Sequence, residues 1–196
     1  MDAASDLSTC FRYSYGVGTG VMGVPNDDSR WGNCYGNIRA TNHMFERAVS
    51  SYTGNLADIK KELAEGHFFR AYNYFYLLKF FGGVPVVTKV LDVTSPELYG
   101  KRNSRYEVVD LILSDLDEAI AGLPLEQNIT SADKGKISKQ AAQAFKARVL
   151  LYEATWRKYN GTSTDFEGSA GPASDQVNTF LEESVQLSET VMGDAA

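Results

Sequence analysis

The segment ELAEGHFFRAYNYFYLLKFFGGVP, residues 62–85, is rich in aromatic residues and predicts the central helix of the fold. Apolar residues recur in it at helical spacing, namely Ala64, Phe68, Ala71, Phe75 and Leu78. Further aromatic residues lie on other sides of the same helix, which is typical of an interior helix: Phe69, Tyr72, Tyr74, Tyr76, Phe80 and Phe81. Gly82, Gly83 and Pro85 are expected to end the helix, and residues 84–88 to be extended.

Apolar periodicity predicts further helices on both sides of this segment. With the central helix, the predicted ranges are about 31–52, 56–81, 104–123, 138–158 and 176–192. Four of them begin at a residue that can cap a helix: Asn55, Ser104, Ser138 and Asp175. Ser104 and Glu107 have the spacing of a capping box.

Alternating helices and turns predict antiparallel helix pairs. We therefore expect an all-α fold of tetratricopeptide-like antiparallel helix pairs with irregular Gly/Asp-rich loops. Residues 1–30 are interpreted as an irregular N-terminal segment, and residues 31–196 as a helical domain that belongs to a longer protein.

The composition, with 43% hydrophobic and 22% charged residues, is that of a globular protein. The formal net charge of -6 argues against a nucleic-acid partner, which requires a basic surface. No apolar run is long enough to span a membrane, and no secretory signal peptide is visible. Cys10 and Cys34 are the only cysteines, so at most one disulfide can form.

Residues that often carry catalysis show no convergent pattern. His43 and His67 lie on different predicted helices without acidic or cysteine neighbours at ligand spacing, so a structural or surface role is expected. Asp115, Asp117 and Glu118 are expected on one solvated helix face, which does not place two carboxylates across a cleft. The sequence therefore indicates a protein that is not an enzyme and has no metal or cofactor.

Arg70 stands among the aromatic residues of the central helix. Because buried arginine is rare unless it is paired, we expect an ion pair between Arg70 and a carboxylate on a neighbouring helix.

Three segments together resemble the SusD/RagB family. Residues 64–87 resemble its signature helix with the Gly-Gly-Val-Pro exit, and residues 106–124 and 135–152 resemble its second and third conserved blocks. The helix that begins at Trp31 fits the one that precedes these blocks.

This resemblance implies an outer-membrane lipoprotein that binds oligo- or polysaccharides at the cell surface. Family members act with a TonB-dependent transporter of the SusC type and contain tetratricopeptide-like helices. The chain is similar to the N-terminal helical part of such a protein. The membrane attachment that the resemblance implies is a lipid anchor, which is not seen in this sequence.

A glycan site is expected where the first predicted helix begins. Sugar recognition combines a flat aromatic face with charged groups that bind hydroxyls, and Asp27, Asp28, Trp31 and Tyr35 bring these types together. The alternative, which the sequence favours, is that Trp31 is the first core residue of its helix.

A second hypothesis about function also follows from the helix pairs. A helical-repeat surface can serve as a protein–protein interaction scaffold that has no sugar site of its own.

Overall fold

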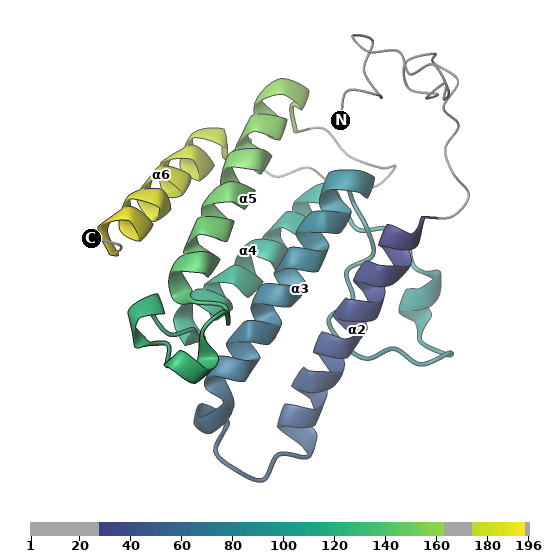
Figure 1. Ribbon diagram of the computed structural model, residues 1–196. Coiled ribbons are helices and arrows are strands. Elements are labelled where there is room, and N and C mark those ends of the chain that lie inside the picture. The colour runs from purple at the N-terminus through teal and green to yellow at the C-terminus, as the bar shows by residue number, and fades with distance from the viewer. Residues whose placement is uncertain (1–27, 163–173, 195–196) are drawn as a thin grey trace, which may run out of the picture. The chain divides into compact units, whose positions relative to one another are not determined.

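A computed structural model describes residues 28–162 and 174–194 (Figure 1). By its internal contacts the chain divides into two units, Met1–Arg30 and Trp31–Ala196. The fold described here is that of the second unit. Cys10 and Asp27 lie outside the described residues.

Five α-helices form most of the described part of the chain, which contains no β-strand. They are α2 (Ser29–Ser50), α3 (Lys60–Phe81), α4 (Arg105–Gly122), α5 (Lys139–Asn160) and α6 (Val177–Asp194). The all-α fold expected from the sequence is confirmed, and the helices end within a few residues of their predicted bounds.

Capping side chains mark the starts of several helices, and glycines mark the ends of two. The side chains of Asn55, Ser104, Ser138 and Asp175 each accept a backbone N–H at the start of the following helical turn. Ser104 and Glu107 form the predicted capping box. At the other ends, Gly82 (φ 68°) and Gly161 (φ 74°) take backbone conformations that residues with a side chain rarely adopt.

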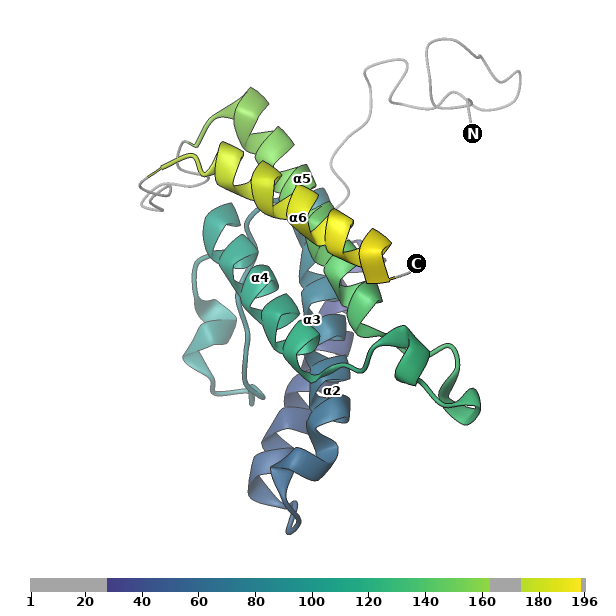
Figure 2. The ribbon, with the colours of Figure 1, turned by 90° about the vertical axis from the view of Figure 1, so that its left-hand side faces the viewer.

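Helix α3 packs most closely against α4, and α5 packs against α6 (Figures 1 and 2). A Cβ atom at Gly122 would lie 2.6 Å from the Cβ of Ala64, so the close approach of α4 to α3 requires glycine there. Phe75 on α3 joins the two pairs through edge-on contacts with Phe145 and Tyr152 of α5, at 5.5 and 5.4 Å between ring centroids. One continuous core therefore runs from α2 to α6.

The central helix is only partly interior. Its predicted apolar face is buried as expected: Ala64, Phe68, Ala71, Phe75 and Leu78. The second aromatic face is not covered, because Phe69, Tyr72 and Phe80 remain 46%, 47% and 47% exposed. The expectation that other elements of this chain enclose α3 on every side is therefore wrong for this face.

Candidate functional site

A groove of about 670 Å³ lies between the first half of α2 and residues 84–98, a segment called the strap below. Helix α2 contributes Trp31, Tyr35, Ile38 and Arg39, which share one face because they lie on successive turns. The strap contributes Pro85, Val87, Lys89, Leu91, Asp92, Val93, Glu97 and Leu98. The lining is mostly apolar, with charged groups toward its edge.

Trp31 lies both on the groove and on the core. Its ring packs edge-on against Phe81 at 5.2 Å and tilted against Tyr35 at 5.1 Å. The guanidinium of Arg102 lies 5.9 Å from the centre of the same ring. Trp31 therefore supports the packing of α2 on α3 while it lines the groove, so the two interpretations of this residue are compatible.

Tyr35 offers its ring to the groove, since its hydroxyl is already engaged. That hydroxyl donates a hydrogen bond to the carbonyl oxygen of Pro85 at 2.7 Å, which joins α2 to the strap. Burial raises the pKa of Tyr35 above its ordinary value, with a further contribution from nearby Tyr74. Tyr35 is thus a neutral aromatic platform whose hydrogen-bond donor is used within the protein.

The charged side chains at the groove edge also have partners within the protein. Arg39 donates to the carbonyl oxygen of Leu91 at 2.6 Å, and the Lys89 ammonium lies 2.5 Å from the Glu97 carboxylate. Hydrogen bonds from the hydroxyl and backbone N–H of Thr94 lower the pKa of Asp92. The groove accordingly combines a mostly apolar lining with charged side chains, of which Arg39, Lys89 and Asp92 are exposed to water.

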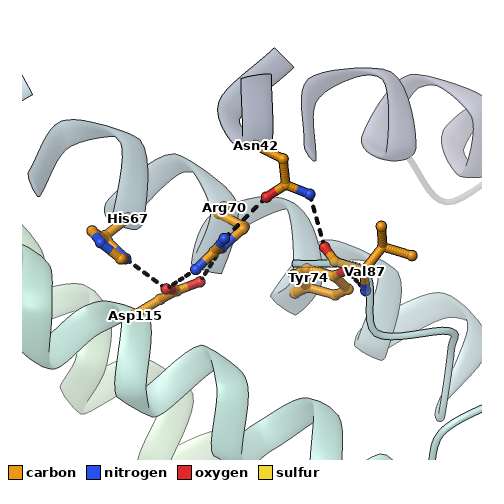
Figure 3. A network of polar contacts seen from close by, with 6 residues as sticks. All are labelled: Asn42, His67, Arg70, Tyr74, Val87 and Asp115. Carbon is orange, nitrogen blue, oxygen red and sulfur yellow. Dashed lines mark hydrogen bonds and ion pairs between the residues drawn. The ribbon is translucent and has the colours of Figure 1, made fainter. Parts of the chain in front are cut away.

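Arg70 forms the predicted ion pair, and its partner is Asp115 on α4 (Figure 3). Its Nε and Nη2 atoms donate to the two carboxylate oxygens at 2.8 and 2.7 Å. Burial raises the pKa of Asp115, but hydrogen bonds from Arg70 and His67 outweigh burial and leave that pKa below its ordinary value. The expectation that Asp115 lies on a solvated face with Asp117 and Glu118 is wrong, because Asp115 is 2% exposed.

The structure brings Trp31 and Tyr35 together on one wall of the groove. Asp28 belongs to the first unit, where its carboxylate accepts from Nε and Nη2 of Arg30 at 2.9 and 2.7 Å. The Arg30 side chain lowers the pKa of Asp28. Asp27 lies outside the described residues, so its role stays a prediction.

Sequence reasoning missed the opposite wall of the groove. From the sequence, residues 84–88 are expected only to be extended, and residues 89–98 receive no assignment. A signal was present, since connections of about 20 residues without regular structure are uncommon unless they carry a function. The apolar residues Val87, Leu91 and Leu98 within that connection also require a surface to pack against.

Other kinds of site find little support in the described residues. No three His, Cys, Asp or Glu side chains among them gather to hold a metal ion. Cys34 is a buried thiol, and burial raises its pKa. None of the helices in ranges 28–162 and 174–194 is long and apolar enough to cross a bilayer.

Comparison with known proteins identifies relatives of most of the helical region. Residues 24–151 match the model of a SusD-like family described as starch-binding and associating with the outer membrane. A SusD-like protein of Formosa agariphila is 35% identical over 108 residues, which are 55% of this chain and 20% of that protein.

Solved structures give the same result. A SusD-like protein of Bacteroides fragilis is 31% identical with a TM-score of 0.59, over 83% of this chain and 28% of that one. A laminarin-binding SusD-like protein is 26% identical with a TM-score of 0.61, over 75% of this chain and 33% of that one. The chain thus spans between a fifth and a third of the length of these relatives.

Proposed function

Because the chain belongs to the SusD-like family, we propose that it is the helical part of a non-catalytic, glycan-binding protein of an outer-membrane nutrient-uptake system. Its ligand is an oligo- or polysaccharide, and its partner is a TonB-dependent transporter of the SusC type. It works at the cell surface. The family description and the laminarin-binding relative support this proposal.

The aromatic wall of the groove is the observation that supports a sugar as the ligand. A pyranose ring has apolar C–H faces and a rim of hydroxyls, so it stacks on aromatic rings and places its hydroxyls toward polar groups. Trp31 and Tyr35 supply adjacent rings, and Arg39, Lys89 and Asp92 stand at the edge. We assign the stacking role to Trp31 and Tyr35. Asp27 and Asp28 remain a separate proposal for hydroxyl contacts.

Calorimetric titration tests this assignment with laminarin, malto-oligosaccharides and xyloglucan oligosaccharides as ligands. For a ligand that binds the wild-type chain, Trp31→Ala should weaken binding about tenfold, which corresponds to the loss of one aromatic stacking contact. Because Trp31 also packs on Phe81, thermal melting must show that the variant is folded. Leu98→Gln provides a second test on the opposite wall, where Leu98 is 53% exposed and its replacement leaves the core intact.

Tyr159→Ala is the matched control. Tyr159 is an aromatic residue on α5, 76% exposed and absent from the groove lining. Its loss should leave the dissociation constant unchanged. Equal weakening by Tyr159→Ala and Trp31→Ala, or no binding of any of the three glycans by the wild-type chain, would contradict a sugar site in these residues.

A second candidate function is a protein–protein interaction scaffold without a sugar site. The observation in its favour is that the polar groups of the groove are engaged with one another, while Val93 and Leu98 stand 85% and 53% exposed at its edge. An apolar segment of a partner protein would suit such a surface. If this second function holds, the double variant Val93→Asp with Leu98→Asp should abolish co-purification with a co-expressed TonB-dependent transporter. The wild-type chain should then bind no glycan.

A further inference from the structure

The backbone of the strap obtains hydrogen bonds from side chains of other elements. Residues 84–92 form neither helix nor strand, so their backbone polar groups need other partners. The amide nitrogen of Asn42, on α2, donates to the carbonyl oxygens of Val87 and Lys89 at 3.0 and 3.2 Å. The Tyr74 hydroxyl, on α3, accepts from the backbone N–H of Val87 at 2.7 Å. Val87 and Lys89 both line the groove.

Arg70 fixes the orientation of the Asn42 side chain by bonding to its amide oxygen. Nη1 of Arg70 donates to Oδ1 of Asn42 at 3.0 Å. A guanidinium can only donate hydrogen bonds, so it requires the amide oxygen and turns the amide NH₂ group toward the strap. The reversed amide would place donors against donors on one side and an acceptor against two carbonyls on the other. Asn42 is 2% exposed, so water does not offer an alternative partner.

Arg70 is oriented in turn by Asp115, through the two-point contact described above. A bidentate arginine–carboxylate pair fixes the plane of the guanidinium as well as its position. Figure 3 shows Arg70 between the Asp115 carboxylate and Asn42, with Val87 on the far side of Asn42. The three side chains come from α4, α3 and α2, and all are buried.

We propose that Asp115, Arg70 and Asn42 are positioning residues that set the place of the strap, and hence the width of the groove, although none of the three lines it. As far as ligand binding is concerned, this inference rests on the proposed glycan site. The position of the strap itself can be measured without a ligand.

The contacts that lead from Asp115 through Arg70 to Asn42 are called the relay below. Hydrogen–deuterium exchange of strap peptides tests directly whether the relay positions the strap. Asp115→Asn keeps the shape of the side chain but weakens its hold on Arg70, so amides in residues 84–92 should exchange about tenfold faster, as expected for the loss of a hydrogen bond that restrains a loop. The dissociation constant for laminarin should rise by about fivefold. Should Asp115→Asn fail to fold, Arg70→Lys serves instead, because a lysine keeps the charge but loses the planar two-point contact with Asp115 that orients the donor to Asn42.

Glu153→Gln is the matched control. Glu153 is also a fully buried carboxylate paired with arginine, but its partners are Arg105 and Arg157, and Arg157 in turn donates to Asp175 and Gln176 rather than to the strap. It should lower thermal stability without changing exchange in residues 84–92. A purely structural role for Asp115 predicts equal effects of the two variants on the strap, and that result would overturn the proposal.

A double variant gives a second criterion. If the relay acts through Asn42, then Asn42→Ala already releases the strap, and adding Asp115→Asn should accelerate exchange of residues 84–92 no further. Additive acceleration would show that Asp115 acts by another route and would contradict the relay. Failure of the wild-type chain to bind glycans would count against the proposed function, whereas the exchange measurements would still decide the relay.

Discussion

Two buried arginine–carboxylate networks stabilise the helix packing, and they differ in what lies at their ends. In the first, Arg70 and Asp115 join α3 to α4. In the second, Glu153 accepts from Nε of Arg105 at 2.9 Å and from Nε of Arg157 at 2.8 Å, which joins α4 to α5. The chemistry is the same in both, but the first reaches the strap through the Asn42 amide, whereas in the second Arg157 donates to the backbone carbonyl oxygen of Asp175 and to the Gln176 side chain, just before α6.

Aromatic rings enclose the arginines of the second network. Arg105 lies 4.1 Å from the ring centre of Trp156, and Arg157 lies 5.1 and 4.8 Å from those of Tyr106 and Phe180. Glu153 itself is 0% exposed. The first network instead ends at His67, whose side chain is 24% exposed, and at the strap. The first network therefore holds one wall of the groove, whereas the second holds the residues that lead into α6, none of which lines the groove.

The largest effect is expected in the enclosed network. Glu153→Ala leaves two buried guanidinium groups without their carboxylate, which should lower the free energy of unfolding by about 4 kcal/mol or more. Urea unfolding followed by circular dichroism measures this, with the exposed Glu118→Ala on α4 as control. A loss no larger than that of the control would show that the aromatic rings alone accommodate Arg105 and Arg157.

A smaller loss is expected in the network that ends at the strap. Asp115→Ala should lower the free energy of unfolding by about 3 kcal/mol, because only one buried arginine loses its carboxylate. Arg70 retains Asn42 and the ring of Phe45, whose centre lies 4.8 Å away. The same urea experiment measures the difference between the two networks. A loss larger than that of Glu153→Ala would reverse the order proposed here.

The smallest effect is expected in how folding stability depends on pH in the acid range. The pKa of Asp115 is lower in the folded chain than its ordinary value, so its ionised form contributes stability that is fully present above about pH 4 and is lost as pH falls through the folded pKa. Between pH 5 and pH 2.5, wild-type stability should therefore fall more steeply than that of Asp115→Asn. Melting temperatures across this range measure it, and parallel slopes would exclude a contribution from Asp115.

Features that depend on neighbours in the chain were predictable. Asn55, Ser104, Ser138 and Asp175 cap helices through atoms a few residues away, and Gly82 ends α3 by its own backbone freedom. The need of Arg70 for a carboxylate also follows from its aromatic surroundings. Such inferences require only helical geometry and the cost of an unpaired charge.

The identity of that carboxylate was not predictable. Asp115 follows Ser114 and precedes Leu116 on α4, so helical periodicity places it at the border of the apolar stripe, where either burial or exposure is compatible with the pattern. Its burial results from the approach of α3, whose Arg70 is 45 residues away in the chain.

The amino-acid sequence was thus sufficient for the all-α class, the ends of the helices and the places of Trp31 and Tyr35 one turn apart on the same helix, because each depends on contacts within a few turns of one helix. The tertiary structure alone revealed the strap as the second wall, the uncovered face of α3 and the partners of the buried arginines. These depend on how closely helices distant in sequence approach each other, and the local pattern of residues does not specify that distance.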